Sequence, residues 1–505
     1  MRFVLLNLRR LCRSPHARRL CGILLVLTGL SGCAGVVGST GGGGNAGTTT
    51  VTILTTSTAN DQLYYFGMVL NSITLTSRSG GTASLITTPI VAEFMHLNGA
   101  TEPLLTVTLP QGVYTAATAS VGSAGFRCVS FDSSNGDIDD AGYGYGYTPA
   151  SHVTMSLPSP ITIAGDHAVV LLNLQVSQSA SWGAGNCAPI SSNNWSITPT
   201  FTIALAGDAN PMQFGLNGMV KTVTQSSGSF TVTAADAPNC IVTIGSSCNP
   251  PAVGPYAPAW QVATDNNTVF EGVAGISQLV AGLAIDMDAA LRPDGSLLAK
   301  RIAVYDADPS NLTVVSGPVE RVYNTMPVIY SAPTESLGPQ NDSSGYSFNF
   351  SNAIFQTSSQ FNNLQDLPFP ASFNATNMVS GQNIYASMHA LVLEPSPTDF
   401  PATTITLIPQ TINGTVSAMG SEGGFTTYTV TLAPYDLFPQ LAVQTGQTTL
   451  LTNPNTVIVY ADSNTQMLNT SPVAVGNVVR FYGLVFNDNG TLRMDCAQVM
   501  DGVAE

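Results

Sequence analysis

A glycine-marked pattern recurs three times in the later part of this 505-residue chain. The pattern begins with a Gly-x-Val triplet, and the three triplets start 99 and 97 residues apart, at Gly218, Gly317 and Gly414. A second glycine follows each triplet after 64, 64 and 62 residues, at Gly282, Gly381 and Gly476. An interval of this size, kept over three copies, is typical of tandem repeats of one small folding unit. The sequence therefore predicts an array of similar domains.

The residues after each second glycine predict strands. An alternating run follows in all three copies, over 283–287, 384–388 and 478–482. Two copies then carry a hairpin turn, Asp294-Gly295 and Asn489-Gly490, because glycine adopts positive φ without steric cost. We expect repeats at 213–310, 312–409 and 411–505. The middle copy departs from the pattern: residues 341–373 form an Asn/Ser/Phe-rich insertion, and its closing turn is not recognisable.

The preceding region, residues 51–207, predicts one further β domain. Runs rich in β-branched residues cover 51–54, 72–76, 104–109, 113–121, 153–157, 160–163 and 168–176. The step from Leu109 to Tyr114 is informative, because Pro110 ends one strand, Gly112 supplies a turn and Tyr114 anchors the next strand with an aromatic ring. No segment shows a helical period long enough for a substantial helix.

Two resemblances extend this interpretation. The Leu109–Tyr114 step, the 157–161 segment and the 169–174 run resemble uncharacterised bacterial lipoprotein domains, a resemblance that implies a transthyretin-like or carboxypeptidase-regulatory-like sandwich without catalytic residues. The repeats resemble an uncharacterised family of small exported β-barrels, similar in shape to an oligonucleotide-binding barrel. The expected fold is all-β, with an N-terminal β-sandwich followed by three small Greek-key, oligonucleotide-binding-like β-barrel repeats.

The N-terminal sequence is typical of a leader peptide for export. Six arginines precede an apolar run over 20–27 that is too short for a permanent membrane span. The run leads to Leu30-Ser31-Gly32-Cys33, which resembles the bacterial lipoprotein signal. That resemblance implies a signal peptide over 1–32, lipidation of Cys33 and sorting to the outer membrane through Ala34. Residues 33–50 form a Gly-rich tether that cannot bury a core.

The net charge of the chain limits the kinds of partner that it can bind. Six of the fifteen basic residues and none of the thirty acidic residues precede Cys33, so the mature chain would carry nine basic and thirty acidic residues, a net charge of −21. Such a chain repels nucleic acid, and the basic, aromatic-interleaved groove that binds single strands is missing from the sequence. We expect contact with a membrane through the lipid, an envelope protein or a glycan as partner, and no nucleic acid.

The remaining cysteines fit an oxidising compartment. We expect one disulfide between Cys128 and Cys187, which lie beside loops of the first domain, and one between Cys240 and Cys248, which flank a short turn. Cys496 lies in a strand-like run and is expected to be a buried lone thiol. No Cys-x-x-Cys pair indicates a zinc site.

A loop of the first domain carries the one candidate metal site. Four carboxylates, Asp132, Asp137, Asp139 and Asp140, surround a glycine in a pattern that either binds Ca²⁺ or is a solvated acidic turn. No other cofactor is expected. The following Tyr143, Tyr145 and Tyr147 form either a contact surface for a sugar or protein, or a loop folded onto its own sandwich.

Enzyme signatures are missing from the sequence. It contains no Gly-x-Ser-x-Gly elbow, phosphate loop or His-Glu-x-x-His motif. Its mature histidines, at positions 96, 152, 167 and 389, are expected on strand or loop surfaces, and Asp286 and Asp288 share a strand face with nothing to mark a perturbed pKa. The expected function is a non-catalytic, lipid-anchored array of binding or structural modules in the cell envelope. The alternative is an envelope hydrolase that uses scattered carboxylates.

Overall fold

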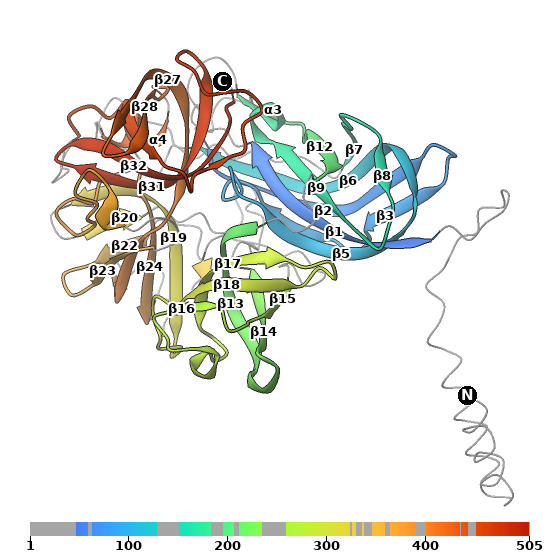
Figure 1. Ribbon diagram of the computed structural model, residues 1–505, viewed down its shortest axis with the longest axis horizontal. Helices are drawn as coiled ribbons and strands as arrows, with labels where there is room; N and C mark the ends of the chain where they lie inside the picture. The colour runs from blue at the N-terminus through green and yellow to red at the C-terminus, as the bar shows by residue number, and fades with distance from the viewer. Residues whose placement is uncertain are drawn as a thin grey trace, which may run out of the picture. The chain divides into compact units, whose positions relative to one another are not determined.

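The computed structural model of the chain contains two packed sheets, one two-stranded sheet formed by β10 (Ala180–Trp182) and β11 (Trp195–Ile197), and three sheets with a recurring strand order (Figure 1). Residues 46–505 form one compact unit. The structure describes residues 47–58, 63–128, 151–182, 195–206, 212–234, 259–323, 326–329, 336–337, 346–358, 364–389, 400–434, 436–442 and 451–503. The expected all-β class is confirmed.

The first domain consists of two sheets around one core. One sheet has the order β12-β9-β1-β5, built from Phe201–Leu205, His167–Gln175, Thr48–Thr58 and Glu102–Pro110. The other has the order β3-β2-β6-β7, built from Thr82–Ile86, Leu63–Ser77, Gly112–Cys128 and Ser151–Met155, with β4 (Ile90–Glu93) beside β2 and β8 (Ile161–Ile163) beside β6. Alternate residues of both sheets, such as Phe66, Ile73, Val170 and Leu172, are buried between them. We call residues 47–206 the sandwich.

The predicted Pro-Gly-Tyr step lies where expected. Strand β5 ends at Pro110, β6 begins at Gly112, and Tyr114 is only 3% exposed. The phenol of Tyr114 donates a hydrogen bond of 2.8 Å to the carbonyl oxygen of Pro110, so the ring ties the turn to the strand that follows it.

The first and third repeats have the same closed topology. The first repeat (212–303) has the order β15-β14-β13-β17-β18-β16, built from Ala259–Ala263, Ser229–Ala234, Met212–Thr224, Ala284–Leu291, Leu297–Ala303 and Val269–Glu271. The third repeat (410–501) has the order β29-β28-β27-β31-β32-β30, built from Thr456–Ala461, Phe425–Thr431, Gln410–Glu422, Val478–Asp488, Thr491–Asp501 and Gln466–Met467. A parallel pairing, β15 with β18 and β29 with β32, closes each sheet into a small barrel.

The second repeat (312–407) has the equivalent strand order, but a different pair of strands makes its parallel pairing. Its sheet runs β23-β26-β24-β19-β20-β22-β25, built from Ile354–Thr357, Thr404–Leu407, Asn383–His389, Leu312–Tyr323, Met326–Ile329, Tyr346–Asn349 and Phe400–Pro401, and β21 (Ser336–Leu337) also pairs with β19. The closing parallel pairing joins β22 to β25, a short strand just before β26. The last strand thus exists, although no hairpin turn in the sequence marks it.

The recurrent glycines have one shared structural cause. In each repeat the valine of the triplet makes two backbone hydrogen bonds with the segment that carries the second glycine. The carbonyl oxygen of the valine accepts from the N–H of that glycine at 2.8–2.9 Å, and the N–H of the valine donates to the carbonyl oxygen of the residue after the glycine. The second glycines have φ values of 91°, 93° and 92°, a left-handed conformation that other residues rarely adopt. At Gly218 and Gly414 a Cβ atom would lie 2.6 Å from a backbone oxygen of the neighbouring strand.

The insertion of the second repeat contributes an aromatic cluster to the third repeat. Phe369 lies 4.9 Å from the ring of Tyr460 and 5.9 Å from that of Phe486, measured between centroids. The guanidinium of Arg493 stands 5.5 Å from the centre of the Phe369 ring. The second and third repeats therefore share one buried core.

Helix is a minor component of the described residues. It comprises two short α-helices, α3 (Val176–Ser179) and α4 (Leu437–Ala442), and three single 3₁₀ turns, Gln225–Ser227, Ile276–Gln278 and Leu364–Asp366. In the part of the chain that the structure describes, none of the helices has the length and apolar character that crossing a membrane requires. Cys496 on β32 is buried with a free thiol, as expected, and burial raises the pKa of that thiol.

Candidate functional site

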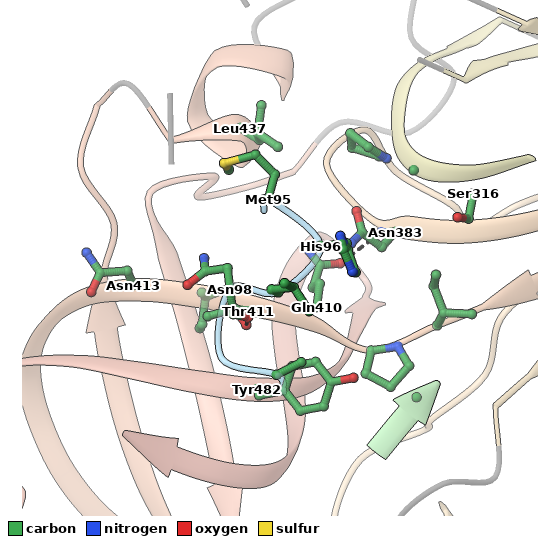
Figure 2. Close-up of a pocket in the computed structure, with 18 of the residues that line it drawn as sticks. Met95, His96, Asn98, Ser316, Asn383, Gln410, Thr411, Asn413, Leu437 and Tyr482 are labelled. Atoms are coloured by element: carbon green, nitrogen blue, oxygen red, sulfur yellow. Dashed lines mark hydrogen bonds between the residues drawn. The ribbon is translucent and has the colours of Figure 1, made fainter. Parts of the chain in front are cut away.

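A cavity of about 190 Å³ lies where the sandwich meets the three repeats. This volume greatly exceeds the roughly 10–15 Å³ that one water occupies by the same measure. The sandwich contributes the loop between β4 and β5, which enters among the strands of the repeats (Figure 2). The lining residues are 63, 95–98 and 100–102 of the sandwich, 214–217 of the first repeat, 316–318, 383 and 408–409 in and after the second repeat, and 410–413, 432, 436–438 and 482 of the third repeat.

His96 is held rigidly on the wall of this cavity by Glu93. The Glu93 carboxylate is 1% exposed and accepts hydrogen bonds from the N–H groups of Phe66, Met95 and His96 at 2.9, 2.9 and 3.1 Å. One of its oxygens also lies 2.8 Å from Nδ1 of His96. A carboxylate can only accept, so Nδ1 of His96 carries a proton and donates it to Glu93. Nε2 lies 3.5 Å from a carboxylate oxygen of Glu102.

His96 was expected on a strand or loop surface. It lies on a loop, but its side chain is only 19% exposed and forms part of the cavity wall. The loop that carries it has no local signature, because the partners Phe66 and Glu102 lie on other strands and most of the remaining cavity wall comes from residues more than a hundred positions away.

Two of the amide side chains on the wall help to hold the fold. Gln410 accepts from the N–H of Asn383 and donates to the carbonyl of Gly381, both at 2.9 Å. Asn413 pairs twice with the backbone of Val503, at 2.9 and 3.0 Å. Each amide therefore makes one bond through its oxygen and one through its nitrogen, which fix its position on the cavity wall.

Asn217 differs from those amides. Its Nδ2 donates to the carbonyl of Gly215 at 3.1 Å. Its Oδ1 is shielded from solvent and has no hydrogen-bond partner among the described residues. A buried acceptor without a donor is costly to the fold, and this oxygen has almost no surface that a water molecule could reach.

A buried ionic cluster lies in the first repeat, behind this wall. Arg301 on β18 contacts Asp286 at 3.0 Å, Asp288 at 2.8 Å and Glu271 at 3.5 Å. Tyr305 donates to the other oxygen of Asp286 at 2.6 Å. Asp288 also accepts from the N–H of Gly215, at 3.0 Å. Since Gly215 lines the cavity, the cluster positions one part of the cavity wall.

The cluster corrects the expectation that nothing perturbs this carboxylate pair. Asp286 and Asp288 share a strand face as predicted, but they are 2% and 5% exposed. Burial raises the pKa of Asp288 to about 6, although the charge of Arg301 acts in the opposite direction. Burial opposes the charge of Arg301 itself, but the two aspartates outweigh this effect and raise the pKa of the guanidinium. Burial, and then the charge of Asp286, raises the pKa of Tyr305.

Asp288→Asn should change how stability depends on pH. The folded pKa of Asp288 is about 6 and its ordinary value is 3.8, so this group stabilises the fold below its ordinary pKa, and that contribution is lost as pH rises through about 6. We expect the loss between about pH 4 and pH 6 to be on the order of 2 kcal/mol in the natural chain and absent in Asp288→Asn. Urea unfolding across this range measures it.

Asp294→Asn is the matched control for that experiment. Hydrogen bonds from Ser296 lower the pKa of Asp294, so its contribution is present above its ordinary pKa and is lost as pH falls through the lowered value. The two variants should therefore alter the profile in opposite directions. A profile of Asp288→Asn parallel to that of the natural chain would show that this carboxyl titrates normally.

A second histidine cluster involves Asp306, Ser387 and His389. Asp306 accepts from Ser387 at 2.8 Å and lies 2.9 Å from Nε2 of His389, whose Nδ1 donates to the carbonyl of Ser310 at 2.8 Å. Burial opposes the charge on His389, but the bonds to Ser310 and Asp306 raise its pKa overall. The Ser387 hydroxyl bonds the carboxylate rather than the imidazole, so these residues do not form a nucleophile–base relay.

Several predicted site residues lie outside the described residues. These are Cys33, the candidate calcium ligands Asp132, Asp137, Asp139 and Asp140, the tyrosines Tyr143, Tyr145 and Tyr147, and the cysteines Cys187, Cys240 and Cys248, together with the side chain of Cys128. Within the described part of the chain, no group of three or more His, Cys, Asp or Glu residues could hold a metal ion.

Comparison with known proteins identifies one domain. Residues 218–303, which cover most of the first repeat, match the family described as "Domain of unknown function (DUF5666)". No curated protein matches the chain. Among solved structures, a deletion mutant of the single-stranded DNA binding protein from Thermus aquaticus is similar at 10% identity and a TM-score of 0.13, covering 39% of this chain and 95% of that one. A score this low carries no argument about fold or function.

Proposed function

We propose that this protein is a non-catalytic, lipid-anchored protein of the bacterial cell envelope that binds a small glycan unit in the cavity between its sandwich and its repeats. The observation that carries the proposal is a cavity of about 190 Å³, large enough for a sugar ring, whose wall carries amide, hydroxyl and carboxylate side chains, among them Asn217, Ser316 and Glu102. Sugars present many hydroxyl groups, which donate to and accept from side chains of these kinds.

The rest of the lining supports a ligand of this class. The lining includes aromatic and aliphatic groups, such as Phe214, Leu216 and Phe438, together with groups that carry a hydroxyl, such as Ser316 and Tyr482. A mostly apolar wall with a few fixed polar groups is the usual form of a small-molecule site. The strongly negative mature chain disfavours nucleic acid and other polyanions as partners.

The glycan proposal is tested by titration calorimetry of the purified chain with neutral mono- and disaccharides. Saturable binding with a stoichiometry of one, and recovery of the sugar unchanged, is the expected result. If no sugar produces heat at millimolar concentration, the proposed ligand class is wrong.

A hydrolase is the second candidate, because Glu102 and Asp436 both line the cavity. Glycosidases act with two carboxyl groups on either side of the scissile bond. However, Asp436 accepts from the N–H of Ala433 at 2.8 Å, a bond that fixes the turn before α4. Release of nitrophenol from chromogenic glycosides, lost in Glu102→Gln, would favour the hydrolase over the binding protein.

The anchor is proposed from the leader and tested separately. Cys33→Ser removes the sulfur that would carry the lipid, so the variant should leave the membrane fraction and lose labelling by radioactive fatty acid. A single acyl chain gives only marginal membrane binding, because its contribution is limited by the number of methylene groups it buries. Stable attachment therefore needs the several chains that a lipidated cysteine would carry. Unchanged fractionation of the variant would contradict lipidation at this position.

A further inference from the structure

A β-bulge in the first repeat shapes one side of the cavity. Strand β13 pairs with β17, and the register of this pairing shifts between Gln213 and Leu216. Two residues of β13, Phe214 and Gly215, therefore stand opposite the single residue Asp288 of β17, which is the pattern of a bulge. Gly215 has a φ of 63°, a left-handed conformation that glycine adopts without strain. The bulge and the two residues after it line the cavity, so the bulge determines the shape of that wall.

The bulge and the carboxylate opposite it occur together in one of the three repeats. Six residues after the second glycine, the position of Asp288 is taken by Ser387 in the second repeat and by Tyr482 in the third. In those repeats the corresponding strand pairs, β19 with β24 and β27 with β31, keep one register over all of their described pairs. The bulge is therefore a special feature of the first repeat and is not required by the barrel topology that the repeats share.

The Asp288 carboxylate holds the bulge with one oxygen and Arg301 with the other. Its Oδ1 accepts from the N–H of Gly215 at 3.0 Å, and its Oδ2 accepts from Nε of Arg301 at 2.8 Å. An ionised carboxylate accepts at both oxygens, and such charge-assisted bonds are about twice as strong as bonds between neutral groups. The negative charge of Asp288 therefore strengthens the bond that fixes the cavity wall at Gly215.

A proton on Asp288 would weaken that bond. Each carboxylate oxygen already faces a donor, and the guanidinium of Arg301 disfavours protonation at Oδ2, so the proton belongs on Oδ1, opposite the N–H of Gly215. Burial raises the pKa of Asp288 to about 6, so this change falls in mildly acidic solution.

Other charged and titratable groups surround Asp288, so its own replacement is needed to isolate its titration. Arg301 and the two tyrosines of the cluster keep their protons in mildly acidic solution, because the pKa of each is raised. The groups are Arg301 on β18, Asp286 on β17, Glu271 on β16, Tyr305 after β18 and Tyr482 on β31, with His96, Glu102 and Asp436 on the wall of the same cavity.

We infer that Asp288 is a positioning residue of the cavity: its protonation releases the N–H of Gly215, loosens the bulge and lowers the affinity of the cavity for its ligand. Release of the bulge is a property of the chain alone, whereas the change in affinity rests on the proposed function. The same proton does not destabilise the fold as a whole, because burial favours the neutral form of the carboxyl.

Hydrogen–deuterium exchange of the full chain at about pH 5 and about pH 7.5 tests the release of the bulge. After correction for the intrinsic effect of pH on exchange, the protection of the Gly215 amide is expected to be about 10- to 100-fold lower at the acidic pH, the range for loss of a hydrogen bond to a charged group. The segment 411–413 of β27, at the corresponding place in the third repeat, should be equally protected at both pH values. Equal protection of Gly215 at both would overturn the inference.

Two aspartate variants assign the effect to Asp288. Asp288→Asn keeps the size of the side chain and cannot ionise, so the protection of the Gly215 amide should become independent of pH. Asp294→Asn, on the exposed turn between β17 and β18, should retain the dependence. Circular dichroism of both variants establishes that they fold. A folded Asp288→Asn variant whose Gly215 amide still responds to pH would refute the assignment.

Calorimetry with neutral mono- and disaccharides at the same two pH values connects the bulge to the proposed function. The natural chain should bind about tenfold more weakly at the acidic pH, and Asp288→Asn should bind equally at both. Equal affinity of the natural chain at both pH values would overturn the inferred role of Asp288 in binding and leave the proposed function intact. If no saccharide binds at either pH, the proposed function is wrong, and the exchange of Gly215 still decides whether the proton releases the bulge.

Discussion

Replacing Arg301 with Met is expected to lower the free energy of unfolding by about 3–5 kcal/mol. The arginine is the cation that balances Asp286 and Asp288, which are nearly inaccessible to solvent. Without it, two carboxylates on one strand face remain buried and repel each other, while methionine retains much of the packing of the side chain. Urea unfolding followed by circular dichroism at neutral pH measures the loss.

A triple variant separates the lost charge from lost packing. Arg301→Met combined with Asp286→Asn and Asp288→Asn removes the three buried charges, leaves the partly exposed Glu271, and should recover more than half of the lost stability. Replacing a whole buried ionic cluster is commonly far less costly than removing one partner. If the single and triple variants were equally unstable, the effect would come from packing and not from the uncompensated carboxylates.

Phe369→Ala is expected to cost about 3–5 kcal/mol, the usual range for removal of a buried phenylalanine. Phe369 is 6% exposed and packs on Tyr460 and Phe486 of the third repeat, beneath Arg493. The variant should therefore destabilise both repeats together. Differential scanning calorimetry resolves separate unfolding transitions, so it measures whether the transitions of the second and third repeats shift together.

The conservative Phe369→Leu variant is the control for that change. Leucine keeps most of the apolar contact and loses the ring, so a smaller cost of about 1–2 kcal/mol is expected. A loss in Phe369→Ala that left the transition of the third repeat unchanged would contradict the shared core.

The repeated strands could be predicted because their signals are local. Gly282, Gly381 and Gly476 recur because each occupies a left-handed position that other residues rarely adopt. The Asp294-Gly295 and Asn489-Gly490 turns have their glycines at φ 82° and 88°, between the strands that were expected there. Positive φ and strand alternation are properties of short segments, so they can be recognised without knowledge of the rest of the fold.

The candidate site could not be predicted in this way. His96, Asn217 and Tyr482 have no common spacing in the sequence, and packing between the sandwich and the repeats brings them to one cavity. Arg301 is similarly uninformative in the sequence, because a single arginine in a strand is usually exposed. The last strand of the second repeat was equally hidden, since ten residues separate the end of β24 at His389 from the start of β25 at Phe400, and no Asn-Gly or Asp-Gly pair lies among them.

The most direct test of the proposed function is to block the cavity and measure sugar binding. Ala100 lines the cavity, so Ala100→Trp should fill it, whereas Ser79→Trp places the same ring on an exposed turn of the sandwich. Titration calorimetry with neutral mono- and disaccharides is predicted to show one saturable site in the natural chain and in Ser79→Trp, and none in folded Ala100→Trp. Equal binding by all three proteins would contradict the proposal that this cavity is the functional site.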